Sequence, residues 1–435
     1  MKLRRHVLSL LQALFLCAGP AQTQEQPQLT PEERRLNIES FEQVWRTVYE
    51  KHFDPSFGGV DWNAVRAEMR PQIEGARDKP EARAIMRQMI SRLKLTHFNI
   101  IPSDVYDKLN QPSARGFLDG VTGIDLRVVD GHALVISVDP GSPADLAGVK
   151  PGWEVVRIGK DEVPSRLASI AQEFEGKSLR DLVLSDAVVG RMTGSIGNSV
   201  TVSFLSGSNQ TVQYSLSLVE ARGKKFRIGH LPPTHVWINV KTLGSDIGYI
   251  VFNGFIDPAT VMPVFNEAIK SFMNGPGIII DLRGNPGGQA EMISGMAGWL
   301  IKEKGKYFGA IRMRDNELKL IIRPRPEVYT GSVAILVDGL SVCASEIFAG
   351  GLRDLGRARI FGSHTAGAAL GGNIERLPNG DGFMYAFANY VTAGGQVIEG
   401  NGLIPDVEVH HTREALLQGR DLILESAVNW IRNNK

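Results

Sequence analysis

The chain has 435 residues, which is long enough for two or three domains with separate hydrophobic cores. Charged residues make up 22% of it and hydrophobic residues 43%, values that are ordinary for a globular protein. The formal net charge of +1 gives no electrostatic footprint for nucleic acid or for an anionic membrane surface, so neither is an expected partner.

Residues 1–21 have the features of a signal peptide. A positive start, with Lys2 and Arg4, precedes the short apolar run 7–17, and the small residues at 19–21 suit cleavage. This apolar run is too short to span a membrane, and no other segment is long enough. We therefore expect an exported protein, periplasmic or secreted, without a transmembrane segment.

Cysteine usage points to one thiol. The sequence contains two cysteines, Cys17 and Cys343. A lipid anchor at Cys17 is disfavoured, because Leu16 stands where a lipoprotein motif needs a small residue. Cleavage of the signal peptide leaves Cys343 without a disulfide partner in its own chain, which marks it as a thiol of interest. The polar, Gln-rich residues 22–30 predict a flexible linker.

Residues 31–112 predict an N-terminal helical segment. Apolar side chains repeat with a period of 3.6 residues in two runs: Phe41, Val44, Trp45, Val48 and Tyr49, then Ile85, Met86, Met89, Ile90 and Leu93. The second run gives way to an extended apolar segment that contains His97. A single histidine at such a boundary is more often structural than functional, so the local pattern alone assigns it no role.

Residues 115–220 change to short strands and turns, with strand-like runs at 123–128, 133–138 and 154–158. The segment 141–159, GSPADLAGVKPGWEVVRIG, resembles the bacterial form of a PDZ domain. PDZ domains add a peptide as an extra strand and hold its C-terminal carboxylate with backbone amides.

The resemblance to PDZ domains assigns the peptide-binding edge to four residues, Gly123, Ile124, Asp125 and Leu126. A rigid spacer with an unused groove is the alternative, because a fold alone does not establish a function. The stretch 176–194 is longer than a minimal PDZ domain needs, and it leaves the helix of the groove undefined.

Residues 226–435 alternate strands and helices and predict an α/β core with a C-terminal helix. A strand at 248–252, an amphipathic helix at 258–274 and a buried strand at 277–282 lead into the glycine-rich turn 283–288. Glycines at a strand end let the backbone approach a ligand and present amides to it. As a bare pattern, however, this is only a turn.

Cys343 follows the apolar run 333–338, which predicts a buried strand, and precedes the helical pattern 346–355. It therefore lies in a strand-to-helix turn. A helix N-terminus can lower the pKa of a thiol and stabilise an oxyanion, so this is a suitable place for a nucleophile. The alternative is a small buried thiol, since free cysteine is among the most buried residue types.

The segment 341–370 resembles the nucleophile region of the tail-specific, or C-terminal-processing, peptidases of peptidase family S41. Members carry their catalytic serine at the position of Cys343, so the nucleophile itself is replaced here. The resemblance covers nearly the whole mature chain. It implies a multidomain α+β protein: helical segment, PDZ-like domain and a crotonase/ClpP-like α/β core. In the family, the turn matching 283–288 supplies an oxyanion amide from Gly287 or Gly288, partnered by the amide of Ala344.

The family also indicates which base serves the nucleophile. Many members use a lysine where this chain has Ala368, and no lysine occurs between Lys319 and Lys435. The tricorn-like branch uses a histidine and a carboxylate instead, which correspond to His97 and Glu399. A Cys-His-Glu triad is chemically coherent, since the carboxylate fixes the imidazole tautomer.

Two other histidine positions compete for a role in the site. His364 is the competing base, and we expect it to be a solvent-exposed turn residue. The adjacent pair His410 and His411 lacks the spacing of metal ligands, so no metal and no cofactor is expected.

Two classes of function follow. The first is an exported endopeptidase that captures polypeptide C-termini through the PDZ-like domain and cleaves with Cys343, His97 and Glu399. The second is a peptide-binding protein that keeps the fold but has lost catalysis at Cys343. Retention of the base, the carboxylate and the oxyanion loop favours the enzyme. Hydrolysis of a non-peptide acyl substrate is a third alternative. The expected partners are polypeptides with accessible C-termini, and the oligomeric state is open.

Overall fold

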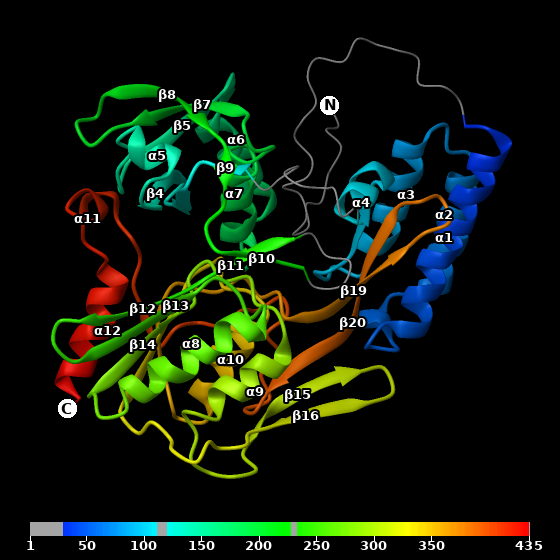
Figure 1. Cartoon of the computed structure of the whole chain (residues 1–435). Helices are drawn as coiled ribbons and strands as arrows, with labels where there is room; N and C mark the ends of the chain where they lie inside the picture. Colours follow the sequence, from blue (N-terminus) through cyan, green and yellow to red (C-terminus); the bar gives the residue numbers. More distant parts are fainter. Residues whose placement is uncertain (1–28, 111–119, 228–232, 435) are drawn as a thin grey trace.

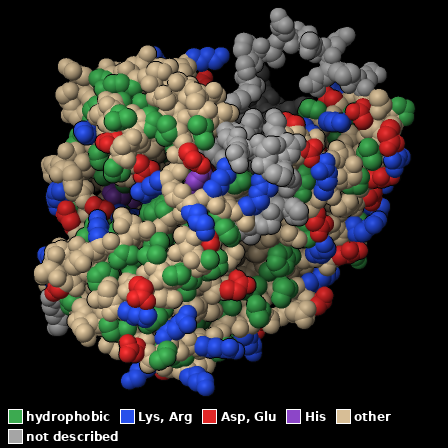
Figure 2. Space-filling model, viewed as in Figure 1, with side chains coloured by type: hydrophobic (Ala, Val, Ile, Leu, Met, Phe, Trp, Pro, Cys, Tyr) green, Lys and Arg blue, Asp and Glu red, His purple; other side chains and the backbone are tan. Residues whose placement is uncertain are grey.

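The computed structural model describes residues 29–110, 120–227 and 233–434, and Figure 1 shows their arrangement. The expected signal peptide, Cys17 and most of the expected linker lie outside the described residues. Among those that are described, no helix is both long and apolar enough to cross a membrane. On the face seen in Figure 2, Lys and Arg side chains are interspersed with Asp and Glu, consistent with the small net charge.

The N-terminal part folds into helices, as the apolar period predicts. The first helix starts at a capping box, in which Thr30 N–H donates to Glu33 at 3.0 Å and Glu33 N–H donates to the Thr30 hydroxyl at 3.2 Å. Its apolar stripe, including Phe41 and Val44, is buried. The elements are α1 (Pro31–Lys51), the short turn η2 (Phe57–Gly59), α2 (Trp62–Glu74), α3 (Lys79–Ser91), β1 (Asn99–Ile101) and α4 (Ser103–Asn110).

These helices are built onto the core. Strand β1 pairs antiparallel with β20 (Gly382–Thr392), and the helices share a hydrophobic cluster with Phe383 and Tyr385 of that strand. A buried ion pair of 2.8 Å between Arg83 and Asp381 joins the same two parts. Because His97 lies just before β1, this pairing fixes its segment against the core.

Residues 120–220, which we call the central domain, contain a six-stranded sheet in the order β3-β4-β5-β7-β8, with β6 paired to β5. Strand β3 lies at the edge of this sheet, and helix α7 packs beside it. Helix α7 lies within the stretch 176–194 that the sequence left undefined. The elements are β2 (Gly120–Val121), β3 (Ile124–Val129), β4 (His132–Val138), α5 (Pro143–Leu146), β5 (Glu154–Ile158), β6 (Asp161–Glu162), α6 (Val163–Glu173), α7 (Arg180–Val189), β7 (Ser199–Leu205), β8 (Thr211–Ser217) and β9 (Val219–Glu220).

The core is a second six-stranded sheet, in the order β12-β13-β14-β17-β18-β21, which is parallel except for the β12–β13 pair. Alternate residues of β14 face opposite layers: Ile278 and Ile280 pack under α8, α9 and α10, and Ile279 packs under α12. Both faces are therefore covered, as expected for a parallel sheet. The elements are β12 (Ile238–Leu243), β13 (Ile247–Phe252), α8 (Pro258–Ser271), β14 (Gly277–Asp281), α9 (Ala290–Ala297), β17 (Ser332–Val337), α10 (Ala344–Asp354), β18 (Arg359–Gly362), β21 (Val407–Glu408), α11 (Arg413–Leu417) and α12 (Leu422–Asn433).

A further sheet, which the sequence analysis did not predict, joins the N-terminal helices to the core. It runs β1-β20-β15-β16, with β19 also paired to β20 (Figure 1). Of two short two-stranded sheets, β2–β9 pairs the start of the central domain with its end, and β10–β11 lies just after it. The remaining bounds are β10 (Lys224–Phe226), β11 (Thr234–Val236), β15 (Tyr307–Met313), β16 (Glu317–Ile321) and β19 (Leu370–Arg376).

Candidate active site

Cys343 lies in the predicted strand-to-helix turn. Strand β17 ends at Val337, and Cys343 is the residue that directly precedes helix α10. Its φ of 54° and ψ of −113° form a combination that residues other than glycine rarely adopt. Such backbone strain persists only where the surrounding structure holds it, and it is common at functional sites.

Two serines hold this turn against the glycine-rich turn 283–288, which we call the glycine loop. The Ser341 hydroxyl donates to the carbonyl of Leu282 at 2.8 Å, and the Ser345 hydroxyl donates to the carbonyl of Asn285 at 2.9 Å. The N–H of Val342 also donates to Asn285, at 3.1 Å. The serines that flank Cys343 in the sequence therefore fix the position of the nucleophile turn relative to the glycine loop.

The two adjacent glycines at the end of the glycine loop have different roles. The Gly287 N–H donates to the Asn285 side chain at 3.0 Å, so it is already occupied. The N–H groups of Gly288 and Ala344, by contrast, act on the Cys343 sulfur, where they oppose the rise in the pKa of the thiol. A Cβ at residue 287 would lie 2.7 Å from the Ala344 nitrogen, and its φ is +88°. Gly287 thus allows the close approach of the two segments, and Gly288 presents the amide.

A buried carboxylate lies beneath the nucleophile turn. Glu346 has no exposed surface and accepts four hydrogen bonds, which come from the Cys343 N–H at 3.0 Å, the Thr365 hydroxyl at 2.5 Å, and the N–H groups of Gly367 and Ala368 at 2.8 and 3.1 Å. Burial raises the pKa of Glu346 to about 7, although the Thr365 hydroxyl and the backbone N–H donors oppose that rise. Ala368, at the family's lysine position, is itself buried.

The sequence-based expectation of a lowered thiol pKa is wrong. Burial, together with the negative charges of Glu346 and Glu399, raises the pKa of Cys343 to about 11. The Ala344 and Gly288 amides oppose this rise. The helix N-terminus does not lower the pKa of the Cys343 thiol, because the Glu346 carboxylate is bonded to the Cys343 N–H at that end of the helix. Cys343 also packs against an apolar cluster that includes Leu182 of helix α7 in the central domain.

His97 and Glu399 are linked through a third residue, Thr96. The Thr96 N–H donates to one oxygen of Glu399 at 2.9 Å, and its hydroxyl donates to the other at 3.1 Å. The same hydroxyl lies 2.7 Å from Nδ1 of His97. Since this hydroxyl gives its only proton to Glu399, it accepts one from Nδ1–H, which leaves Nε2 free to act as an acceptor.

The protonation state of His97 suits a general base. Burial lowers the pKa of His97 to about 4, so its imidazole is neutral at pH 7. Burial raises the pKa of Glu399 to about 7, and the hydrogen bonds from Thr96 and Ala369 oppose that rise. The sequence analysis missed Thr96, although a hydroxyl residue directly before the candidate base was a visible signal.

A series of hydrogen bonds with one peptide link runs from the Cys343 backbone N–H to the His97 ring, while no hydrogen bond joins the Cys343 sulfur to that ring among the described residues. From Cys343 it passes through Glu346 to Gly367 and Ala368, and the next residue, Ala369, donates to Glu399 at 3.1 Å. From Glu399 it continues through the Thr96 hydroxyl to the His97 ring. Segments from both ends of the chain thus meet in one network.

The other histidines lie outside this network. His364 is exposed, and its Nε2 lies 2.5 Å from the carbonyl of Asn401. His410 lies 3.1 Å from Glu408, and His411 is buried elsewhere. Across the described ranges, no group of three or more His, Cys, Asp or Glu side chains is arranged to hold a metal ion.

The expected peptide-binding edge lies on and just before β3. Gly123 has a φ of +83°, and a Cβ there would lie 2.2 Å from the side chain of Ser142, so only glycine fits. Part of the strand edge is already bonded within the chain: Val128 N–H donates to the Ser185 hydroxyl of α7 at 3.4 Å, and Arg127 donates to the Leu126 carbonyl at 2.9 Å.

Comparison with known proteins shows which families the chain resembles. Residues 246–409 match the model of Peptidase family S41, and residues 34–91 match that of the Tricorn protease C1 domain. The chain is 27% identical over 414 residues to a carboxyl-terminal-processing protease of Picosynechococcus sp., covering 93% of this chain and 89% of that protein. It is 26% identical over 316 residues to a probable CtpA-like serine protease of Staphylococcus aureus, covering 69% of this chain and 56% of that protein.

Solved structures share the fold at low sequence identity. The photosystem II D1 C-terminal processing protease has a TM-score of 0.57 at 22% identity, covering 88% of this chain and 94% of its own. Mature CPAF has a TM-score of 0.64 at 13% identity, covering 93% and 98%. The segment that matches the Peptidase family S41 model thus includes Cys343, Glu399 and the glycine loop, and the segment that matches the Tricorn protease C1 domain precedes it in the chain.

Proposed function

We propose that the protein hydrolyses peptide bonds, with Cys343 as nucleophile, His97 as base and Glu399 as the orienting carboxylate. The observation that carries this proposal is the close approach of the glycine loop to the nucleophile turn, where a Cβ at residue 287 would lie 2.7 Å from the Ala344 nitrogen and 2.9 Å from the Cys343 Cβ, and where the Gly288 and Ala344 amides act to lower the pKa of the thiol. An oxyanion that forms on a carbonyl attacked by this sulfur lies beside the same two donors. Loss of one such donor typically costs about 10²–10³ in rate.

In the proposed reaction, the Cys343 sulfur attacks the carbonyl carbon of the scissile bond and its proton passes to Nε2 of His97. The oxyanion accepts hydrogen bonds from Gly288 and Ala344. His97 then protonates the departing amine, the C–N bond breaks, and the acyl group stays on the sulfur as a thioester. Water attacks the thioester with His97 again as base, which releases the acid and returns the proton to the thiol.

The timing of proton transfer follows from the electrostatics of the turn. Because burial and the charges of Glu346 and Glu399 raise the pKa of Cys343 to about 11, the resting thiol is neutral. The proton therefore leaves during the attack, as it does from a serine hydroxyl, and no thiolate–imidazolium pair precedes it. The neutral His97 in the required tautomer supports this order.

We also propose that the central domain captures the C-terminus of an extended polypeptide as a PDZ-like domain, at Gly123, Ile124, Asp125 and Leu126. The edge position of β3 supports strand addition. Because Arg127 already bonds the Leu126 carbonyl, the peptide adds at the Gly123 end. Calorimetry with a peptide and its C-terminally amidated form tests this: the amidated form should bind clearly more weakly, and equal affinities would exclude carboxylate capture. Export by the N-terminal segment belongs to the same proposal.

One observation favours a second candidate, a protein that binds peptides but turns them over poorly. The site raises the pKa of its thiol, which makes Cys343 a weaker nucleophile than the thiol of a preformed ion pair. The groups proposed to act on Cys343, a neutral histidine and a buried carboxylate, are those that activate the hydroxyl of a nucleophilic serine.

Peptide hydrolysis by the mature protein, by Cys343→Ser and by Cys343→Ala separates the two candidates. Activity in the wild type that disappears in Cys343→Ala supports the thiol peptidase. An inactive wild type with an active Cys343→Ser protein supports the impaired form. Inactivity of all three, in proteins that circular dichroism shows to be folded, would reject a peptidase site.

A further inference from the structure

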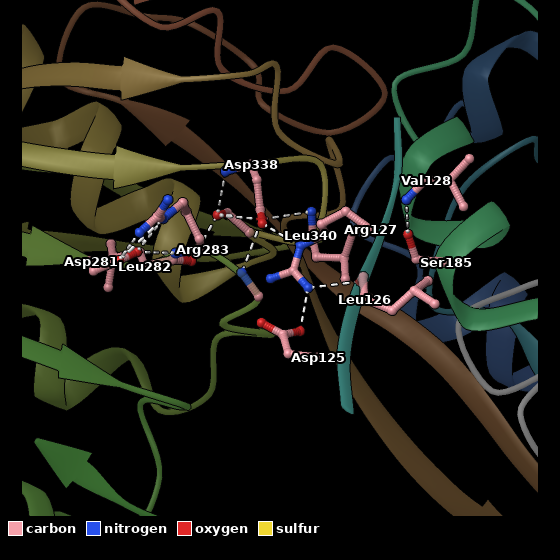
Figure 3. Close-up of polar contacts among 12 residues, drawn as sticks. Asp125, Leu126, Arg127, Val128, Ser185, Asp281, Leu282, Arg283, Asp338 and Leu340 are labelled. Carbon is pink, nitrogen blue, oxygen red and sulfur yellow. Dashed lines mark hydrogen bonds and ion pairs between the residues drawn. The ribbon is translucent and has the colours of Figure 1, made fainter. Parts of the chain in front are cut away.

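A buried arginine reaches from the central domain into the core. Arg127 leaves strand β3 and its side chain, 10% exposed, places Nε 2.6 Å from Oδ2 of Asp338 (Figure 3). Its Nη1 donates to Asp125 at 2.5 Å and to the carbonyl of Leu126. The contact between Arg127 and Asp338 therefore joins two parts of the protein that have separate sheets.

Asp338 stands between the two backbone segments that form the candidate site. One of its oxygens, Oδ1, accepts the N–H of Gly284 at 2.9 Å and the N–H of Leu340 at 3.0 Å. Gly284 belongs to the glycine loop, and Leu340 belongs to the turn that leads to Cys343. One carboxylate thus holds the starts of both segments that carry the proposed oxyanion amides.

The charge of Asp338 depends on Arg127. A buried carboxylate is strongly disfavoured unless it is paired and hydrogen-bonded. Burial raises the pKa of Asp338, but the guanidinium of Arg127 and the N–H groups of Gly284 and Leu340 outweigh burial and bring the pKa below its usual value. Burial likewise lowers the pKa of Arg127, and the charges of Asp125 and Asp338 more than reverse this. Both partners are therefore charged.

The guanidinium also lies directly against the glycine loop. A Cβ at residue 284, where φ is +69°, would lie 2.6 Å from Nη2 of Arg127. Helix α7 makes a second contact nearby, since a Cβ at residue 339 would lie 2.5 Å from the Cβ of Asp181. The central domain thus contacts both the glycine loop and the nucleophile turn.

We propose that Arg127 is a positioning residue for the glycine loop and the nucleophile turn, acting through Asp338. By holding Asp338 charged and in place, it keeps the N–H groups of Gly284 and Leu340 bonded to one acceptor. This in turn sets the distance between the amides of Gly288 and Ala344. The kinetic part of this inference rests on the proposed peptidase function, and its structural part does not.

The kinetic test compares Arg127→Gln with Arg157→Gln on a short peptide. Arg127→Gln leaves a buried, unpaired carboxylate, and we expect kcat to fall about tenfold, less than the loss of a whole oxyanion donor, with KM within about twofold. Arg157 lies in the same sheet in an exposed 2.5 Å ion pair with Glu162, and Arg157→Gln should match the wild type. Arg127→Lys keeps the charge without the forked geometry and should recover part of kcat.

The structural test is hydrogen–deuterium exchange of the full chain. In Arg127→Gln, the amides of residues 284–288 and 338–344 should exchange at least about tenfold faster than in the wild type, and those of Arg157→Gln should not change. Exchange at the wild-type rate in both segments would overturn the inference. If the wild type hydrolyses no peptide, the proposed function fails and exchange alone decides the role of Arg127. If Arg127→Gln does not fold, exchange in Arg127→Lys decides it in the same way.

Discussion

The two sides of the candidate site are held in different ways. On the nucleophile side, Ser341, Ser345 and Val342 each donate to the strand end and glycine loop next to Cys343, and Glu346 collects four further donors. On the base side, the ring of His97 makes a single polar contact within the described part of the chain, with the Thr96 hydroxyl. Thr96 in turn meets Glu399 across 303 residues of sequence.

This difference teaches where the site is sensitive. Where several neutral hydrogen bonds fix the same backbone, loss of one leaves the others to hold it. Where a single hydroxyl sets the tautomer and direction of a ring, its loss removes the whole effect. The Arg127–Asp338 pair is an exception on the nucleophile side, because its loss leaves a buried charge rather than a missing neutral bond. The predictions below test this contrast.

Loss of the base should have the largest effect. His97→Ala removes the group that accepts the thiol proton, and loss of a positioned base costs about 10²–10⁴ in rate. We expect kcat/KM for peptide hydrolysis to fall by that factor. The unfolding temperature should stay close to that of the wild type, since the ring contributes only the hydrogen bond with the Thr96 hydroxyl.

The matched control is His364→Ala, which removes an exposed imidazole bonded to the carbonyl of Asn401. It should leave kcat/KM near the wild-type value. Equal losses in the two variants, or none in either, would reject His97 as the base.

Loss of the Thr96 hydroxyl should have the second largest effect. Thr96→Val keeps the shape of the side chain but removes the donor to Glu399 and the acceptor for Nδ1–H of His97. The ring is then free to take the wrong tautomer or orientation, and misplacement of a catalytic group can cost about 10²-fold. We expect kcat to fall about 10- to 100-fold, and Thr96→Ser, which restores the hydroxyl, to recover most of it. An unaltered kcat in Thr96→Val would show that Thr96 does not orient the base.

The sequence predicts much of this fold and less of its assembly. The helical period around Phe41 and the apolar runs that became β14 and β17 correspond to the structure, because these patterns are local. The sheet β1-β20-β15-β16 escaped prediction, because its strands come from distant parts of the chain and pair only in the folded state. It is this sheet that brings the segment of His97 to the core.

The site was predicted as a set of residues but not as an electrostatic environment. His97 and Glu399 do meet, through Thr96, but neither Thr96 nor the raised pKa of the Cys343 thiol was foreseen, and the catalytic roles of the three residues remain a proposal. A helix N-terminus is visible in sequence. The burial of its flanking carboxylate, Glu346, depends on the loop 365–369 and on packing by the central domain, which are long-range features.

The pH dependence should show the state of Glu399. Because burial raises the pKa of Glu399 to about 7, its ionised form, which accepts the Thr96 hydroxyl, increases as the pH rises through neutrality. We expect kcat/KM to rise about tenfold between pH 6 and pH 8, the change in ionised fraction for a group that titrates near 7. Because burial lowers the pKa of His97 to about 4, His97 should not titrate between pH 6 and pH 8 and should not alter the profile there.

Glu399→Gln is the control for this pH profile. It cannot ionise, so its activity should be low and the rise due to Glu399 should disappear; any slope that remains between pH 6 and pH 8 belongs to Glu346, whose pKa burial also raises to about 7. A wild-type profile that is also flat across that range would exclude Glu399 as the titrating group.

The smallest effect is expected for one serine on the nucleophile side. Ser345→Ala removes the donor to Asn285, but the Asn285 carbonyl still accepts Val342 N–H and its side chain still accepts Gly287 N–H. We expect the free energy of unfolding to fall by about 1 kcal/mol, the usual net contribution of one hydrogen bond, and kcat to fall only about threefold. Ser40→Ala is the matched control, because Ser40 is equally buried and, far from this site, donates to the Leu36 carbonyl at 2.7 Å and accepts the Asn379 N–H at 3.0 Å. It should lose similar stability with kcat unchanged. If Ser345→Ala instead lowered kcat more than Thr96→Val does, the nucleophile side would depend on a single contact, and the contrast between the two sides would be reversed.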